Sequence, residues 1–430
     1  MSINKRVSLN LDVRGLLPSA TLAINDRSKE LQAEGKTIYR LGLGQSPFPV
    51  PTPVVDALKL HAHEKDYLPA KGHPALREEV AEFHRRKDGV DAHPDNVLIG
   101  PGSKELMFLL QLAYYGELVV PSPCWVSYVP QATILGRRVR LIQTRFEDHW
   151  HLTSDRFEQL CERENDDFRP RIVVLNYPGN PDGCTYTIDE LKELAEIARK
   201  YEVILLSDEI YGQLNHKGNH VSVARYYPEG TIISSGLSKW CGAGGWRLGT
   251  FTFPSDLDWL LETMAVVASE TYTSVSAPIQ YAAIRAFAGG THIERYLWHT
   301  RRILSALGNH CAEVLRRAGI RVQSPEGAFY LFLDFTPLTD RLARKGIADS
   351  ARMCSRLMDE TGVAILPGAS FERDPEELTA RMAYVDFDGA RTLTASETIP
   401  LENPLPEDFL ETWCHKVIKA VEIMAEWADQ

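Results

Sequence analysis

Short apolar runs alternate with amphipathic stretches from about residue 95 to residue 235, and this alternation constrains the fold more than any other feature. The runs lie at residues 97–99, 118–120, 171–175, 203–206 and 231–233. Strands of this uninterrupted apolar kind are buried on both faces, and helices between them allow parallel pairing. The sequence therefore predicts an α/β fold with a mostly parallel sheet covered by helices.

Polar side chains follow these apolar runs where each strand is expected to end. Ser103 comes after the first run, Asn180 after the third, Asp208 after the fourth and Lys239 after the fifth. Ligands of parallel sheets collect at the carboxyl ends of the strands. We expect these four residues to meet at one site.

The pattern changes after about residue 290. A helical pattern at residues 293–318 precedes short strands at 321–323, 329–333, 363–365 and 382–387, and one final helix is expected from about residue 406 to beyond residue 424. This part is predicted to form a smaller α+β domain that N-terminal residues complete. The predicted domains are residues 50–295, and residues 1–49 together with 296–430.

Charge and hydropathy narrow the classes of partner. The net charge is −11 and the pI is near 5.7, which disfavours nucleic acid as a partner. No run approaches the roughly 18 to 20 apolar residues that span a bilayer. Residues 1–17 have no apolar core of a signal peptide. We expect no nucleic acid and no membrane partner, and a cytoplasmic location.

The cysteines and histidines indicate neither a disulfide framework nor a metal site. The chain has seven scattered cysteines with no Cys-x-x-Cys pair, so reduced thiols are expected. His61 and His63 lie two residues apart in a predicted helix, where they point in different directions. We expect no metal.

Residues 234–249 surround one lysine, Lys239, with glycines and small side chains, and Arg247 follows eight residues later. Partial desolvation in such a turn lowers the pKa of a lysine and favours Schiff-base formation. An arginine fork suits a phosphate. Taken alone, this segment is equally consistent with a solvated lysine in a loop.

Two further segments favour a cofactor site. Asn180 lies in a turn straight after a buried strand, and Asp208 ends the next strand with Tyr211 three residues later. A buried aspartate needs a cationic partner or hydrogen bonds. A pyridinium nitrogen is such a partner, and a carboxylate beside it keeps the ring protonated as an electron sink.

Together these segments resemble the class I and II aminotransferases of pyridoxal-phosphate fold type I, from about residue 38 to residue 390. The resemblance implies a large domain with a seven-stranded type of sheet and pyridoxal 5'-phosphate as cofactor. It implies that Lys239 forms the Schiff base and later moves the proton of the substrate α-carbon. Asp208 would pair with the pyridine nitrogen, while Tyr211 and Asn180 would bind the phenolic oxygen.

The same resemblance implies the phosphate contacts. Arg247 and Ser238 would bind the phosphate with the backbone amides of Ser103 and Lys104, at a helix N-terminus that is itself an anion site. Tyr67 would reach the phosphate of the neighbouring subunit. The active sites would then be shared, and the protein would be a homodimer.

Substrate contacts are implied in the same way. Arg381 resembles the arginine that binds the substrate α-carboxylate, and Gly44 lies in the N-terminal stretch that approaches this carboxylate. Asn180 would contact the substrate as well as the cofactor. Trp125 resembles the aromatic that stacks on the cofactor ring. The alternatives are that Trp125 simply packs in the core and that Arg381 belongs to a structural ion pair.

This sequence also departs from the family pattern. Gly236 stands where a serine or threonine usually contacts the phosphate, and Asp182 stands where threonine is commoner. Residues 269–276 lack the arginine that often marks dicarboxylate-specific members, and Glu270 would repel a second carboxylate if it pointed into the site.

The expected reaction is the transfer of the amino group of an L-amino acid to a 2-oxo acid through the pyridoxamine form of the cofactor. A carbon–sulfur lyase or an aminocyclopropane-carboxylate-synthase-like enzyme would use the same residues and stays open. A ligand domain of a transcription regulator is disfavoured, because only about forty residues precede the first motif. Because residues 269–276 lack an arginine, a small neutral amino acid or a broad range is the expected substrate. Aromatic side chains that could suit an apolar or aromatic substrate are Trp125, Tyr128, Tyr272 and Tyr330.

Overall fold

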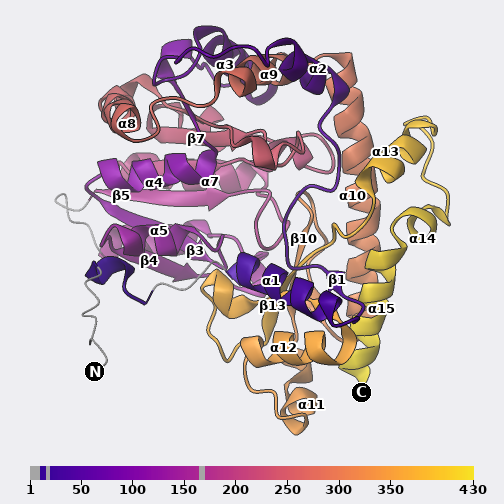
Figure 1. Ribbon diagram of the computed structural model, residues 1–430. Coiled ribbons are helices and arrows are strands. Elements are labelled where there is room, and N and C mark those ends of the chain that lie inside the picture. Colours follow the sequence, from indigo (N-terminus) through magenta and orange to yellow (C-terminus); the bar gives the residue numbers. More distant parts are fainter. Residues whose placement is uncertain (1–9, 16–19, 164–169) are drawn as a thin grey trace, which may run out of the picture.

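The computed structural model describes residues 10–15, 20–163 and 170–430 (Figure 1). Residues 1–9, on which the signal-peptide expectation partly rests, lie outside this description. Seven strands form the largest sheet: β2 (Val97–Gly100), β3 (Glu117–Ser122), β4 (Val139–Gln143), β5 (Arg171–Asn176), β6 (Ile204–Asp208), β7 (Thr231–Gly236) and β8 (Gly249–Thr252).

The strand order in this sheet is β2-β8-β7-β6-β5-β3-β4. β8 runs antiparallel to both of its neighbours, and the other neighbouring pairs are parallel. The five strands expected from the apolar runs are present, and the α/β fold with a mostly parallel sheet is confirmed. β4 and β8 were not expected. β4 is a half-buried edge strand, and β8 has the sequence Gly-Thr-Phe-Thr rather than an apolar run.

Alternating residues of the strands face two different helix layers. Leu118, Ile172 and Leu206 pack in one cluster with α4 (Ser103–Ala113) and α8 (Asp258–Thr271). Val119 and Val173 pack in another cluster with α6 (Ser154–Arg163) and α7 (Ile188–Lys200). Both faces of the sheet are therefore covered, which explains why its strands are apolar throughout.

Other helices complete this part of the molecule. α2 and α3 pack against α9 above the sheet in the view of Figure 1, and α5 lies beside α4. Their bounds are α2 (Thr52–Leu60), α3 (Pro74–Asp88), α5 (Tyr128–Ile134) and α9 (Ala277–Ala288).

The second part of the molecule is built on a four-stranded antiparallel sheet in the order β12-β13-β10-β9. Beside it, β1 pairs in parallel with β11, which brings N-terminal residues next to this part. The strands are β1 (Tyr39–Arg40), β9 (Arg321–Val322), β10 (Tyr330–Asp334), β11 (Val363–Ala364), β12 (Leu366–Pro367) and β13 (Thr379–Ala383).

The long helix α10 (Thr291–Arg317) passes from the first part to the second along the right-hand side of Figure 1. It packs against α15 (His415–Asp429) and α13 (Gly389–Glu397). The remaining helices are α1 (Ala20–Ala33), α11 (Thr339–Arg344), α12 (Ser350–Thr361) and α14 (Phe409–Trp413).

The expectation of one final helix was wrong, because the helix is interrupted at Cys414, between α14 and α15. Cys414 has φ −121° and ψ 20°, outside the helical range. The hydroxyl of Thr392, on α13, donates to the carbonyl of Trp413 at 3.4 Å, so that carbonyl has a partner outside its own helix. This contact belongs to tertiary packing and cannot be read from the helical pattern.

Candidate active site

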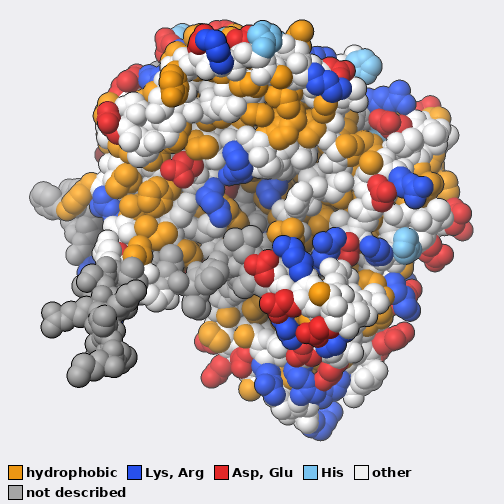
Figure 2. Space-filling view, viewed as in Figure 1, with side chains coloured by type: hydrophobic (Ala, Val, Ile, Leu, Met, Phe, Trp, Pro, Cys, Tyr) orange, Lys and Arg blue, Asp and Glu red, His pale blue; other side chains and the backbone are white. Residues whose placement is uncertain are grey.

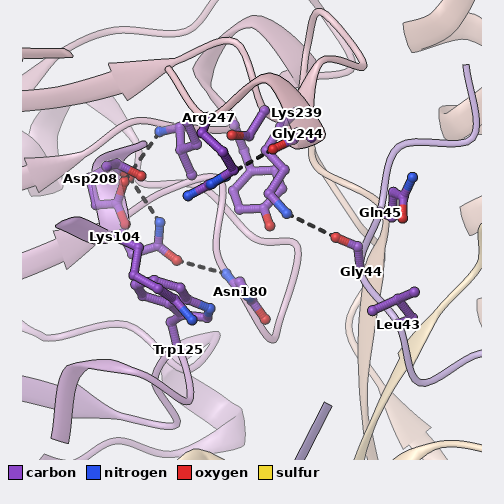
Figure 3. Close-up of a pocket in the computed structure, with 16 residues that line it drawn as sticks. Leu43, Gly44, Gln45, Lys104, Trp125, Asn180, Asp208, Lys239, Gly244 and Arg247 are labelled. Atoms are coloured by element: carbon purple, nitrogen blue, oxygen red, sulfur yellow. Dashed lines mark hydrogen bonds between the residues drawn. The ribbon is translucent and has the colours of Figure 1, made fainter. Parts of the chain in front are cut away.

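The carboxyl ends of the central strands open into a cavity of about 610 Å³. β5 ends at Asn176 and β6 at Asp208, and these two residues are neighbours in the sheet register. Figure 2 shows a hollow near the centre of the face, with Lys and Arg side chains beside it. The cavity is lined by Leu43, Gly44, Gln45, Ser103, Lys104, Trp125, Asn176, Asn180, Asp208, Ile210, Tyr211, Ser238, Lys239, Gly244, Gly245 and Arg247 (Figure 3).

One end of the cavity is suited to an anion. α4 begins there at Ser103, and the first amides of a helix have no intrahelical acceptor. Gly102 precedes it at φ 92°, and a Cβ on Gly102 would collide with the guanidinium of Arg247. Arg247 itself has φ 58°, an uncommon conformation that clusters at functional sites. Its guanidinium donates to the carbonyls of Gly244 at 2.9 Å and Pro101 at 3.2 Å.

Three cations share this end. Burial lowers the pKa of the Lys104 ammonium, and the charges of Arg247 and Lys239 lower it further. Among the described residues, Lys104 has no carboxylate partner, and its Nζ lies 5.2 Å from the centroid of the Trp125 ring. A phosphate bound by Arg247 and the first amides of α4 would relieve part of this repulsion and would leave the Lys104 ammonium available to a second anion. The residues present therefore fit the phosphate of pyridoxal 5'-phosphate.

Lys239 reaches the cavity from the turn after β7. Its Nζ donates to the carbonyl of Gly44 at 2.8 Å and lies 5.5 Å from the centroid of the Tyr211 ring. The acceptor is a neutral carbonyl, and among the described residues Lys239 forms no ion pair with a carboxylate. Lys239 is thus placed to react with an aldehyde bound in the cavity.

Asp208 lies buried at the floor of the cavity. Its carboxylate accepts hydrogen bonds from the hydroxyls of Tyr128 at 2.6 Å and Ser234 at 3.3 Å. Burial raises the pKa of the Asp208 carboxyl to about 6, although these hydrogen bonds lower it. No lysine, arginine or histidine of the described chain forms an ion pair with it. A protonated ring nitrogen would supply the missing cation, and the site fits a pyridinium.

Tyr211 and Asn180 also line the cavity, whereas Arg381 is not part of the lining and contacts the site through Asn180. The guanidinium of Arg381 donates to the Asn180 side-chain oxygen at 3.0 Å and to the Gly42 carbonyl at 2.5 Å. Its buried Nε has no hydrogen-bond partner among the described residues. Burial lowers the pKa of the Arg381 guanidinium. Among the described residues it forms no ion pair with a carboxylate, and its Nε retains a donor that could serve an external anion.

The other predicted site residues divide into two groups. Ser238 and Trp125 line the cavity, and Trp125 also packs edge-on against Tyr128 at 5.2 Å. Tyr67 lies outside the cavity with 90% of its surface exposed, so it makes no contact with the phosphate end of its own chain. Glu270 is exposed and does not line the cavity.

The two departures from the family pattern have local causes. A Cβ on Gly236 would lie 2.8 Å from the Leu248 carbonyl oxygen, so the backbone leaves no room there for a serine. Asp182 is buried beside the cavity, where it accepts from the Cys184 amide at 2.8 Å. Burial raises the pKa of Asp182 to about 6, although the charge of His151 lowers it.

Several site residues were not predicted from the sequence. Tyr128 was considered only as a substrate contact, yet it donates to Asp208. Asn176 ends its strand beside Asp208, a position that could have identified it. The cavity lining adds Leu43, Gln45, Ile210, Gly244 and Gly245.

Two global properties complete the description. All seven cysteines are buried free thiols, as expected. Within the described ranges, every helix is too short or too polar to cross a membrane.

Comparison with known proteins identifies relatives over most of the chain. The family model described as aminotransferase class I and II matches residues 36–387. The aspartate aminotransferase of Geobacillus stearothermophilus is 32% identical over 408 residues, which cover 93% of this chain and 97% of the relative. The asparagine–oxo-acid transaminase of Streptococcus mutans is 30% identical over 382 residues, which cover 85% of this chain and 92% of the relative.

A solved structure agrees in fold. The aspartate aminotransferase of Thermus thermophilus with maleate has a TM-score of 0.82 and 27% identity, over 98% of this chain and 100% of that chain.

Proposed function

Because this chain belongs to the class I and II aminotransferases and is a pyridoxal-phosphate-dependent transaminase, we propose that its cavity residues divide into a cofactor set and a substrate set, and that the substrates are dicarboxylic. The relatives that match most of the chain are transaminases by name. Transamination is therefore the reaction of this family member rather than the lyase alternative.

The cofactor set holds and polarises the cofactor. Arg247, Ser238 and the first amides of α4 would bind the phosphate, and Trp125 would pack against the ring. Asp208 would accept a hydrogen bond from the protonated ring nitrogen, while Tyr211 and Asn180 would donate to the phenolic oxygen. Bound pyridoxal 5'-phosphate supplies an electron sink for the bond broken at the substrate α-carbon.

Lys239 carries the reactive amine. It would hold the cofactor covalently, and its amine, once free, would take the proton from the substrate α-carbon and return it on the cofactor side. Its hydrogen bond to the Gly44 carbonyl supports this role, because it keeps the amine at the centre of the cavity.

The α-carboxylate of the substrate binds Arg381. Arg381 keeps a buried Nε donor without a partner among the described residues, and its contact with Asn180 ties it to the cofactor set. Fixing the carboxylate orients the α-carbon bond that breaks, which is a positioning effect.

The proposal that the substrates are dicarboxylic rests on Lys104. Its ammonium lines the cavity, is partly buried and has no carboxylate partner in the described chain. A second carboxylate at 3 to 4 Å from it would be bound in a partly desolvated site. This replaces the expectation of a small neutral amino acid, which rested on the missing arginine in residues 269–276.

The test is a half-reaction screen of amino acids, followed by loss of the absorbance of the bound cofactor. Aspartate and glutamate should react with a higher kcat/KM than neutral amino acids. Lys104→Met keeps the stem but removes the charge, and should lower kcat/KM for dicarboxylates by roughly 30- to 1000-fold. Neutral substrates should be unaffected, and Lys59→Met on exposed α2 is the control. Equal losses for all substrates would contradict the proposal.

We further propose a homodimer in the cytoplasm, with residues 50–295 as one domain and residues 1–49 with 296–430 as the other. The exposure of Tyr67 supports a shared site, since a tyrosine meant for a neighbouring phosphate must project from its own chain. Exposed Leu60 and Val266 add apolar surface. Buried unpaired cysteines are typical of a reducing compartment.

Mixing two inactive variants tests the shared site. Lys239→Ala removes the amine and Tyr67→Ala removes the contact from the neighbour. A mixed dimer contains one complete site, so activity should appear on mixing and re-equilibration. Unchanged inactivity, with both variants dimeric in sedimentation, would contradict the shared site.

A further inference from the structure

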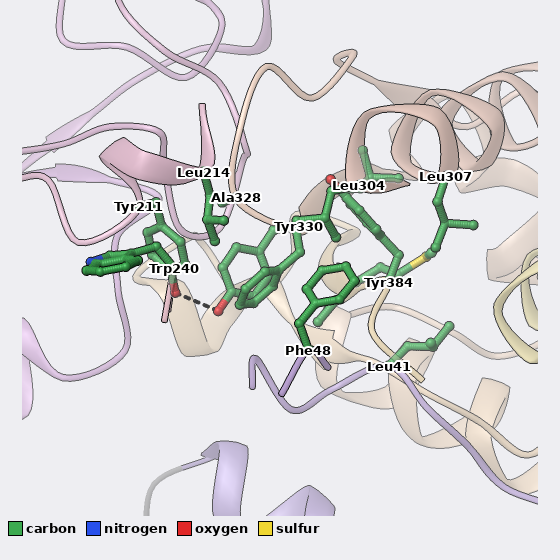
Figure 4. Packing of buried hydrophobic residues seen from close by; sticks show 14 of the residues in the cluster. Leu41, Phe48, Tyr211, Leu214, Trp240, Leu304, Leu307, Ala328, Tyr330 and Tyr384 are labelled. Atoms are coloured by element: carbon green, nitrogen blue, oxygen red, sulfur yellow. Dashed lines mark hydrogen bonds between the residues drawn. The ribbon is translucent and has the colours of Figure 1, made fainter. Parts of the chain in front are cut away.

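The hydroxyl of Tyr330 lies where three separate segments of the chain meet. Tyr330 begins β10 and is buried with 1% exposure. Its hydroxyl is 2.7 Å from that of Tyr211, which follows β6 in the other part of the molecule (Figure 4). A Cβ on Gly44 would collide with this hydroxyl, so Tyr330 also contacts the loop whose carbonyl accepts from Lys239.

The number of hydroxyl protons limits the hydrogen bonds that the two phenols can donate. A tyrosine hydroxyl has one proton to donate and can also accept. If Tyr211 donates to Tyr330, it has no proton left for a ligand in the cavity. If Tyr330 donates to Tyr211, the Tyr211 proton is free to point at the ligand. Within the described chain, the Tyr330 hydroxyl has the Tyr211 hydroxyl as its hydrogen-bond partner, so this donation satisfies both groups.

Neighbouring charges favour the second arrangement. The guanidinium carbon of Arg381 lies 4.7 Å from the centroid of the Tyr330 ring, and a nearby positive charge strengthens a hydroxyl as a donor. Burial raises the pKa of the Tyr211 hydroxyl well above its ordinary value, so Tyr211 stays protonated and can donate. The two rings meet edge-on at 5.5 Å and 80°, which fixes both hydroxyls.

We propose that Tyr330 is a positioning residue that donates to Tyr211 and thereby directs the Tyr211 proton to the phenolic oxygen of the bound cofactor. The inference rests on the proposed role of Tyr211. Hydrogen bonds in such a chain polarise one another, so the donation also strengthens the contact that Tyr211 makes. Stabilising the phenolic anion lowers the pKa of the nitrogen that joins Lys239 to the cofactor.

The test is a pH titration of the visible absorbance of the holoenzyme. Tyr330→Phe removes only the hydroxyl and should raise the observed pKa by roughly half a unit to one unit. Tyr211→Phe should raise it further. The double variant should equal Tyr211→Phe alone, because Tyr330 acts through Tyr211. Tyr384→Phe is the matched control, since the buried Tyr384 hydroxyl has no hydrogen-bond partner among the described residues, and its titration should match the wild type.

The results distinguish a failure of this inference from a failure of the proposed function. Borohydride trapping at Lys239 in every variant shows that the cofactor site is intact. With trapping intact, an unshifted titration of Tyr330→Phe overturns the role of Tyr330 and leaves the transaminase assignment unchanged. Additive shifts in the double variant overturn action through Tyr211. Loss of trapping in the wild type would instead contradict the proposed function.

Discussion

The guanidinium of Arg381 donates to the side-chain oxygen of Asn180 at 3.0 Å, which joins the four-stranded sheet to the turn after β5. The same guanidinium donates to the carbonyl of Gly42. The group proposed to bind the substrate carboxylate is therefore tied to the group proposed to bind the cofactor. The hydrogen bond between Arg381 and Asn180 therefore couples the substrate contacts to the cofactor contacts.

Replacing Arg381 should act on substrate rather than on cofactor. Arg381→Lys keeps the charge but loses the planar fork, so kcat/KM for the amino acid should fall by about 30- to 1000-fold. Steady-state kinetics measures this loss. The amount of bound cofactor should not change, and a variant with normal kcat/KM would contradict the assignment.

Asp208 should make the unfolding free energy of the cofactor-free protein depend on pH. Burial raises the pKa of Asp208 to about 6, above an unfolded value of about 3.9. The folded state therefore binds the proton more tightly, and this stabilisation, complete below about pH 4, is lost as pH rises through about 6. Asp208→Asn should gain up to about 3 kcal/mol of unfolding free energy over the wild type between about pH 4 and pH 7.

Denaturant unfolding of the cofactor-free proteins at several pH values measures this gain. Asp91→Asn, at an exposed carboxylate, is the control and should follow the wild type. A pH profile of Asp208→Asn parallel to the wild type would show that Asp208 is not the titrating group.

The buried pair of Glu209 and His220 should hold the turn that carries Asp208 and Tyr211. Nε2 of His220 lies 2.9 Å from the Glu209 carboxylate, which also accepts from Ser207 at 2.7 Å. His220→Ala leaves this carboxylate buried without its cation, so it should cost about 3–5 kcal/mol of unfolding free energy. His93→Ala, at an exposed histidine, should cost less than about 0.5 kcal/mol.

The pH dependence of this loss has a definite sign. Burial alone lowers the pKa of His220, but the Glu209 carboxylate, helped by Asp88 and opposed by Arg301, leaves the pKa raised. A raised histidine pKa contributes stability that is complete below about pH 6.5 and is lost as pH rises through the folded pKa. The deficit of His220→Ala should shrink at alkaline pH. A deficit that grows there would exclude the charged pair.

Gly44 should tolerate no side chain. A Cβ at this position would collide with the hydroxyl of Tyr330, so Gly44→Ala must displace Tyr330 or the loop, and should cost about 1–3 kcal/mol of unfolding free energy. A Cβ on Gly245 meets nothing within 4 Å. Gly245→Ala should therefore unfold within about 0.5 kcal/mol of the wild type, and equal effects of the two changes would refute the contact.

The sequence predicts those parts of the fold and site that depend on local pattern. Buried parallel strands are apolar throughout, so their carboxyl ends, and with them Asp208 and Lys239, were located correctly. β8 was missed because its pairing is antiparallel and its residues include glycine and threonine.

Contacts between distant segments could not be predicted. Tyr128 reaches Asp208 across 80 residues, and Tyr330 reaches Tyr211 across 119. The periodicity of the sequence does not reveal these contacts, because they form only when the helices and the two parts of the molecule pack together. Lys104 was expected to contribute its backbone alone, and the open ammonium became visible only with the cavity around it.

The central claim is that Lys239 holds the cofactor, and Lys104 in the same cavity makes a direct test possible. The holoenzyme is reduced with borohydride, digested, and the modified peptide is identified by mass spectrometry. The predicted result is cofactor on Lys239 in the wild type and none trapped in Lys239→Ala. Cofactor on Lys104 or on any other lysine of the wild type would contradict the account.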